Sequence, residues 1–152
     1  RYYFFMKDIA LLLEKTLDTF ASTIAKEQLD WHTKPQPGKW SNIEIIGHLI
    51  DSANNNIQRL VRGTYENDFK IVYRQETWVT VQKYAEASAP DVIQLWLLLN
   101  KQFIRLLRNY PADRMYVSTD IGKHLPEIKT MHEVAQGYLE HLQHHLNQII
   151  PL

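Results

Sequence analysis

The chain contains no cysteine. This absence excludes disulfide bonds, cysteine nucleophiles and sulfur-rich zinc sites, so any metal ion must be bound through nitrogen and oxygen atoms. A chain without cysteine also agrees with a cytoplasmic location, where structural disulfides are rare. We therefore expect a cytoplasmic protein whose chemistry does not depend on a thiol of its own.

Neither sign of charge is in excess, because 17 basic side chains balance 17 acidic ones. A nucleic-acid-binding domain usually has a basic surplus, so no nucleic-acid partner is expected. The sequence also lacks the roughly 18 uninterrupted apolar residues that a membrane helix needs, which argues against a membrane partner. The N-terminal stretch RYYFFMKDIALLLEK is interrupted by charged residues and precedes no small-residue cleavage site, so it does not read as a signal peptide.

The length of 152 residues fits one domain with its own hydrophobic core. We therefore predict a single domain over residues 1–152. The chain does not begin with methionine, and we interpret residues 1–5 as an N-terminal remnant, with Met6 as the candidate start.

The apolar residues recur with helical spacing in four segments, and no convincing alternating strand pattern lies between them. The pattern predicts helices over about 6–26, 42–62, 90–110 and 131–150. Two starts carry capping boxes, Ser41 with Glu44 and Thr130 with Glu133. The 90–110 segment is apolar around most of its circumference, which is typical of a central buried helix.

Four amphipathic helices without strands predict an all-α four-helix bundle. About 26 residues separate the second and third helices, far more than a tight antiparallel turn needs. The pattern predicts a short helix within this connection, over about 79–87. A crossover of this length allows the second and third helices to run parallel, and long connections often carry binding sites.

Three of the seven histidines lie within HLQHH near the C-terminus. His141 and His145 are four residues apart, so on a helix both imidazoles face the same side and can reach one ion. This spacing is common by chance in a histidine-rich chain. The helical wheel places both beside the apolar stripe, whereas His144 lies roughly 120° from Tyr138 and is expected to face solvent. We interpret Tyr138 itself as a core residue.

A catalytic metal site commonly has three protein ligands, and His48 on the second helix is the candidate for the third. Polar residues follow it along the same face: Asp51, Ser52, Asn55 and Arg59. Because the apolar stripe of this helix points the other way, periodicity favours a solvated face over the wall of a pocket. The other histidines, His32, His124 and His132, are predicted to be surface or loop residues.

Three stretches together resemble the DinB/YfiT-like superfamily of metal-dependent enzymes: PGKWSNIEIIGHLIDSANNN, ETWVTVQKY and YLEHLQHHLNQI. The likeness covers roughly residues 30–150. It implies an up-down-down-up four-helix bundle and a divalent metal ion bound by His48, His141 and His145. The resemblance therefore implies that the polar face of the second helix lines the metal site, whereas the periodicity favours a solvated face. It also implies a homodimer, and it implies no DNA binding.

The superfamily that the sequence resembles includes thiol S-transferases that use bacillithiol, mycothiol or glutathione. We therefore expect a metal-dependent enzyme that transfers a low-molecular-weight thiol to a small electrophilic substrate, or a related hydrolase. Imidazole ligands favour zinc or nickel, with iron or manganese as alternatives. A metal-binding or scaffold bundle without turnover is the competing hypothesis, and a structural bundle without metal is the third.

Several further residues have candidate roles. Asp51, one turn after His48, could orient a ligand or act as a general base, and solvent exposure or a salt bridge is an equal alternative. Asn55 and Arg59 are candidates for binding polar groups of a substrate. Trp40 and Ile45 have the spacing of a hydrophobic staple at the start of the second helix, and an aromatic ring such as that of Trp40 near the pocket mouth could also contact substrate.

Overall fold

The computed structural model describes residues 5–152. The predicted N-terminal remnant, residues 1–5, lies outside this range except for Phe5. None of the helices within residues 5–152 is both long enough and apolar enough to cross a lipid bilayer.

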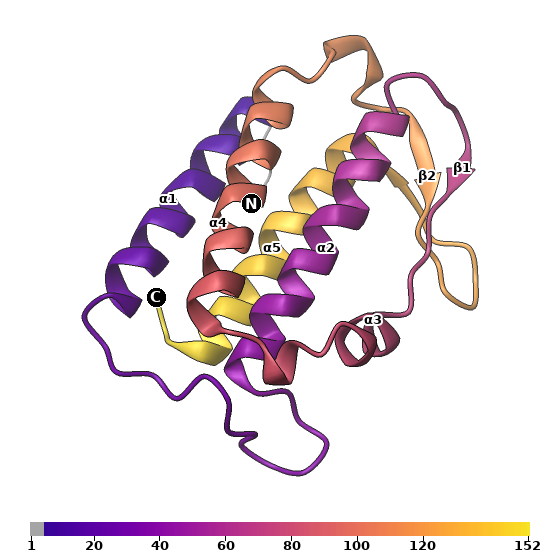
Figure 1. The fold of residues 1–152 in the computed structure, drawn as a ribbon. Coiled ribbons are helices and arrows are strands. Elements are labelled where there is room, and N and C mark those ends of the chain that lie inside the picture. The colour runs from indigo at the N-terminus through magenta and orange to yellow at the C-terminus, as the bar shows by residue number, and fades with distance from the viewer. Residues whose placement is uncertain (1–4) are drawn as a thin grey trace.

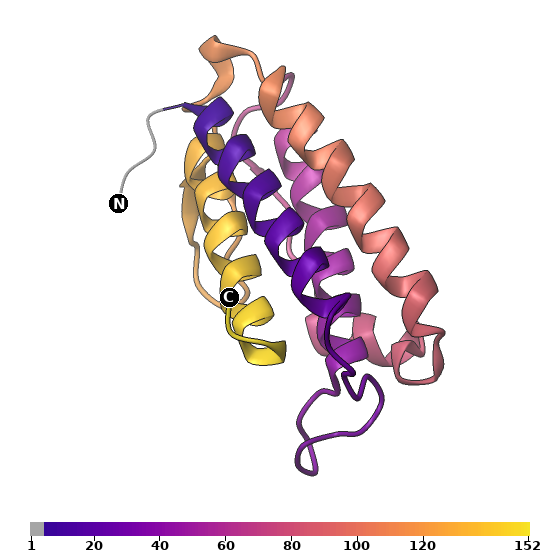
Figure 2. The same cartoon turned by 90° about the vertical axis from the view of Figure 1, so that its left-hand side faces the viewer.

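Four long helices form a bundle (Figures 1 and 2). They are α1 (Met6–Ile24), α2 (Asn42–Arg62), α4 (Ala89–Arg108) and α5 (Met131–Ile149). Helices α1 and α2 each pack against both α4 and α5. Figure 1 shows that α2 and α4 run in the same direction, while α1 and α5 run in the opposite one. The predicted up-down-down-up bundle is therefore confirmed.

Both predicted capping boxes are present. The Ser41 side chain accepts a hydrogen bond from the backbone N–H of Glu44, and the Glu44 carboxylate accepts one from the backbone of Ser41. Thr130 and Glu133 make the same pair of bonds at the start of α5. These bonds satisfy N–H groups that the first turn leaves without helical partners, which is why the two starts could be read from the sequence.

The absence of strands was a wrong expectation. Three short strands, β1 (Phe69–Lys70), β2 (Ser118–Asp120) and β3 (Ile128–Thr130), form one sheet in the order β1-β2-β3. Strands β1 and β2 are parallel, with Phe69 opposite Thr119, and β2 and β3 are antiparallel. Strands of two or three residues are too short to show an alternating pattern.

The crossover between α2 and α4 also differs from the prediction. The short helix expected over about 79–87 is present as two pieces, α3 (Gln75–Val81) and the 3₁₀ helix η1 (Tyr84–Glu86). Gln82 and Lys83 separate them, with Lys83 in the left-handed region. A second 3₁₀ helix, η2 (Ala112–Arg114), follows α4. The crossover lies against α2, because both α3 and η1 contact that helix.

The core lies between the four long helices. Phe20 meets Trp96 edge to face, and Phe103 stacks on Tyr138 with ring centroids 3.9 Å apart, so Tyr138 is the core residue that was predicted. Helix α4, in contrast, is not buried on all sides. Leu95 and Leu98 are 52% and 54% exposed, so one apolar face of α4 lies at the surface and the predicted central position is wrong.

Candidate metal centre

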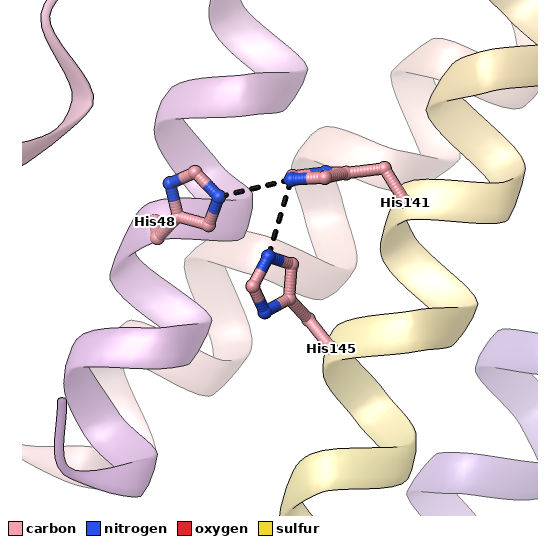
Figure 3. Close-up of side chains that lie close together, drawn as sticks. All are labelled: His48, His141 and His145. Carbon is pink, nitrogen blue, oxygen red and sulfur yellow. Dashed lines mark hydrogen bonds between the residues drawn. The ribbon is translucent and has the colours of Figure 1, made fainter. Parts of the chain in front are cut away.

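His48, His141 and His145 meet between α2 and α5 (Figure 3). These two helices are antiparallel neighbours, so the first turns of α2 lie beside the last turns of α5. The Nε2 atom of His141 is 3.1 Å from Nε2 of His48 and 3.1 Å from Nε2 of His145. One ring nitrogen from each histidine lies within 4.8 Å of the other two. Within residues 5–152, no other group of histidine and carboxylate side chains is arranged to share an ion.

The three imidazoles are neutral at physiological pH. Burial, together with the charges of the neighbouring histidines, lowers the pKa of His48 to about 3 and that of His141 to about 4. Burial also lowers the pKa of His145. A neutral imidazole keeps a lone pair on one ring nitrogen, which is the form that binds a metal ion.

A hydrogen bond fixes which nitrogen of His145 faces the cluster. Its Nδ1 atom is 2.8 Å from Oε1 of Gln148, and an amide oxygen can only accept. Nδ1 therefore carries the hydrogen, and the lone pair of the neutral ring lies on Nε2, toward the other two histidines. Metal-binding histidines commonly donate their second N–H to such a partner, so Gln148 is a positioning residue that the sequence reading missed.

His48 is the most buried of the three, with 1% of its surface exposed. The ring of Trp40 lies over it at a centroid distance of 4.8 Å and is 6.5 Å from that of His145. Trp40 was predicted first as part of a staple, with substrate contact near the pocket mouth as the alternative, and in the structure it forms a wall of the histidine cluster. Nδ1 of His48 has no hydrogen-bond partner among the described residues, so the protein leaves one polar atom of this ring unpaired.

The polar stripe of α2 is buried, which overturns the solvated face that periodicity favoured. Asp51, Ser52, Asn55 and Arg59 are each less than a tenth exposed. The crossover covers them: Arg59 donates to the backbone oxygen of Ile71, and crossover residues also bond to Asp51. Periodicity failed because it compares the two faces of one helix and does not see a distant segment that packs on the polar face.

Asp51 is fully buried and forms no salt bridge with residues 5–152, so neither part of the alternative, solvent exposure or a salt bridge, is seen in the part of the chain that the structure describes. Its Oδ1 atom accepts hydrogen bonds of 2.8 Å from the hydroxyl of Tyr84 and from Nε2 of Gln82. Its Oδ2 atom is buried and has no partner among residues 5–152. Burial raises the pKa of the Asp51 carboxyl, and the bonds from Gln82 and Tyr84 oppose this shift. No local sequence pattern pointed to Gln82 or Tyr84.

The sequence matches the DinB superfamily over residues 12–149. The chain belongs to the DinB superfamily. A comparison with curated protein sequences gave no match, whereas several solved structures share the fold.

One of these structures is YfiT from Bacillus subtilis, described as "a probable metal-dependent hydrolase with an unusual four-helix bundle topology". It has 20% sequence identity and a TM-score of 0.82, over 95% of this chain and 83% of that one. Two structures of a mycothiol-dependent maleylpyruvate isomerase, one of them a mutant, match with TM-scores of 0.78 and 0.75 at 6% and 8% identity. The two matches cover 97% and 95% of this chain, but only 61% and 60% of the length of the isomerase chains. At these identities the likeness shows a common fold.

The remaining histidines of this DinB protein lie outside the cluster, as predicted. His144 is exposed on α5, with its ring centroid 5.3 Å from that of His145, and His32 and His124 are also exposed. His132 is half-buried in the first turn of α5.

The histidine cluster lies between two cavities. The larger, of about 740 Å³, is lined by His145, Trp40 and Gln148, together with the loop before α2 and the start of α3. The smaller, of about 510 Å³, is lined by His141, Ser52 and Arg59, with residues from α5 and the β2–β3 hairpin. Each cavity is therefore bordered by one histidine of the cluster.

Of the two predicted substrate-binding residues, Arg59 lies at a cavity and Asn55 does not. Arg59 lines the smaller cavity. The Nδ2 atom of Asn55 donates to the backbone oxygen of Asp51 at 2.9 Å, and Asn55 lines neither cavity. Their predicted roles stay predictions.

Proposed function

We propose that this DinB-superfamily protein is a metal-dependent enzyme that transfers a low-molecular-weight thiol to a small electrophilic substrate. His48, His141 and His145 would hold the divalent ion. When bound, the ion supplies the Lewis acidity that turns a thiol into a nucleophile near pH 7. The enzyme needs this help because the chain has no cysteine that could attack the substrate itself.

The observation that carries the proposal is the convergence of three neutral imidazole nitrogens with no carboxylate among them. Structural zinc sites usually have four protein ligands, whereas catalytic sites have three and leave a position for a reactant. Three ligands from two rigid helices match the catalytic arrangement. The set of nitrogen donors suits zinc or nickel, and also iron; manganese remains the weaker candidate.

The two cavities support a reaction with two reactants. Because His145 lines one cavity and His141 lines the other, a thiol and its acceptor could reach the cluster from different sides. Trp40 shields His48 from solvent on the side of the larger cavity. A protein that only stores or senses a metal has no need for two cavities beside the ion.

Asp51 is proposed to take up or return a proton during the reaction. It is a carboxylate one turn from His48, its pKa is raised, and its Oδ2 atom accepts no hydrogen bond from residues 5–152. A carboxylate with a raised pKa is better matched to proton transfer near neutral pH than an exposed one. Gln82 and Tyr84 hold its other oxygen in place.

Hydrolysis is the second candidate reaction, with water in place of the thiol. The fold shared with YfiT, described as a metal-dependent hydrolase, favours it, while the fold shared with a mycothiol-dependent isomerase favours thiol chemistry. The competing hypothesis is a metal-binding or scaffold bundle without turnover.

Elemental analysis of the untagged protein tests the proposal, alongside His48→Ala and His141→Ala. We expect about one divalent ion per chain, lost in both variants and kept in His144→Ala, which removes an exposed histidine of the same helix. Incubation with bacillithiol, mycothiol or glutathione and a set of electrophiles then measures thiol transfer by mass spectrometry, with hydrolysis followed in the same samples.

Two outcomes would contradict the proposal. A wild-type protein that cannot be loaded with zinc, nickel, iron or manganese would eliminate a metal-dependent enzyme. A protein that holds the ion but neither transfers a thiol nor hydrolyses any substrate would favour the non-catalytic bundle.

A further inference from the structure

Arg59 is a buried cation that forms no ion pair with any residue of the described range 5–152. Its surface is 7% exposed. A buried charge is costly unless an opposite charge and hydrogen bonds compensate it. In this protein the hydrogen bonds that compensate the charge come from neutral groups, the backbone oxygen of Ile71 and Oδ1 of Asn56, while Glu127 adds an electrostatic attraction without an ion-pair contact.

These bonds leave part of the guanidinium free. Nε and one N–H of Nη2 bond to Ile71, and one N–H of Nη1 bonds to Asn56. A guanidinium has five N–H groups, so one remains on each terminal nitrogen. Arginine recognises a carboxylate through two such parallel bonds. The bonds to Ile71 and Asn56 also hold the side chain in place, so little flexibility is lost when an anion binds.

Arg59 faces the smaller cavity, which also contacts His141. The carboxylates around this cavity already have partners. Glu133 belongs to the capping box of α5, Glu140 accepts a bond from Gln136, and Glu127 lies 3.9 Å from Nζ of Lys129. The buried charge at this cavity is therefore the positive charge of Arg59. The acidic residues at the edge of the cavity disfavour polyanions such as nucleic acid.

A second polar atom in this cavity has no partner. Oε1 of Gln136 is buried and accepts no hydrogen bond from residues 5–152, and Gln136 lines the same cavity as Arg59. It offers an acceptor to a hydroxyl or amide group of a ligand. A free donor pair and a free acceptor are what a binding site for a small polar molecule requires.

We propose that the smaller cavity binds the carboxylate end of a small organic acid and that Arg59 is the residue that recognises it. This inference rests on the proposed function, because the other end of the acid would lie at the histidine cluster. His48 and Arg59 are separated by roughly three helical turns, about 16 Å along α2. Helical side chains lean toward the N-terminus, so Arg59 leans toward the cluster, and an extended molecule could reach both.

The test compares hexanoate with the neutral hexanamide, titrated into the metal-free protein and followed by NMR. We expect hexanoate to bind at least tenfold more tightly and to shift the signals of residues around Arg59. In Arg59→Gln this preference should fall by about ten- to a hundredfold, as for the loss of hydrogen bonds to a charged group. Arg62→Gln, one turn further along α2 and paired with Glu66 at the surface, should bind like the wild type.

Equal binding of hexanoate and hexanamide to the wild type would overturn the inference without any variant, so a folding defect in Arg59→Gln cannot obscure the result. Arg59→Lys keeps the charge but loses the paired donors, and it should retain only part of the preference. If both Arg59 variants kept the full preference for hexanoate, that result would also overturn the inference.

Metal content measured on the same samples separates this inference from the proposed function. Arg59→Gln should keep the ion and lose the preference for hexanoate, whereas His48→Ala should lose the ion and keep that preference. Mercaptohexanoate added to the zinc-loaded protein then identifies the reactant. If tight binding of mercaptohexanoate requires both Arg59 and the histidines, the carboxylate belongs to the thiol reactant. If it requires Arg59 alone, the carboxylate belongs to the acceptor. Either result supports the smaller cavity as the site that binds the acid.

Discussion

The hydroxyl of Tyr84 donates a 2.8 Å hydrogen bond to Oδ1 of Asp51 across the boundary between the crossover and the bundle. It joins residues far apart in the chain and holds a buried carboxylate one turn from His48. Burial and the neighbouring carboxylate raise the pKa of Tyr84, so the phenol keeps its hydrogen and remains a donor. This bond couples the crossover to the candidate site.

Replacing Tyr84 with phenylalanine should destabilise the protein by about 1.5–3 kcal/mol, because a buried charged acceptor loses one of its two donors. Urea unfolding of Tyr84→Phe and the wild type measures this. Tyr116→Phe is the matched control, since Tyr116 is 72% exposed, and it should change the free energy of unfolding by less than about 0.5 kcal/mol. A similar small change in Tyr84→Phe would show that the bond contributes little.

Gly47 allows Tyr84 to approach α2. A Cβ atom at this position would lie 2.3 Å from the Tyr84 ring, so Gly47→Ala must displace the ring and its bond to Asp51. We expect a loss of about 2–3 kcal/mol, as for overpacking in a core. Gly137→Ala on α5 is the control, because its Cβ would meet nothing within 4 Å, and it should stabilise the helix by about 0.5–1 kcal/mol. Thermal unfolding of the two variants should move in opposite directions.

Asp51→Asn should separate catalysis from structure. The asparagine oxygen can still accept from Tyr84 and Gln82, and its amide nitrogen replaces the unpaired Oδ2 atom. We therefore expect metal content and fold to be kept while kcat falls at least a hundredfold, because the proton acceptor is lost. Circular dichroism, elemental analysis and the thiol-transfer assay check the three parts. Full activity in Asp51→Asn would remove Asp51 from the reaction.

The metal-free protein should lose stability as the pH falls below about 6.5. The pKa of His48 is about 3 in the folded state and 6.5 in its unperturbed state, so in this interval the unfolded chain binds more protons than the folded one. The free energy of unfolding is unaffected by His48 well above pH 6.5, where the ring is neutral in both states. By pH 5 the protonation of His48 in the unfolded chain should lower it by about 2 kcal/mol. His141, with a folded pKa of about 4, acts in the same direction.

Unfolding free energies measured by urea at a series of pH values test this prediction. The double variant His48→Gln, His141→Gln should show a shallower decline than the wild type. Equal slopes would mean that neither histidine is held neutral by the fold.

Binding of zinc should raise the melting temperature, and a chelator should reverse the rise. A ligand at a hundred times its Kd stabilises the folded state by about 2.7 kcal/mol, which corresponds to roughly 5–10 °C for a domain of this size. Differential scanning calorimetry should show this rise in the wild type and in His144→Ala. A rise of the same size in His48→Ala would place the zinc elsewhere.

The sequence alone determined the elements that depend on local interactions. The two capping boxes, the proline in the first turn of α4 and the recurring apolar residues are contained within single helices, and their starts appear where they were predicted. The spacing of His141 and His145 is likewise a property of one helix. His48 was added through the resemblance to the family, and not through its own pattern.

Tertiary structure decided which residues surround the site. His48, Asp51 and Arg59 lie on a polar stripe whose periodicity indicates solvent, yet the crossover buries it. Tyr84, Gln82 and the short strands belong to segments with little regular pattern, so their positions depend on contacts with residues far along the chain. Periodicity records the two faces of a helix, whereas the burial of a polar face depends on which distant segment packs against it, and that is decided only when the chain folds.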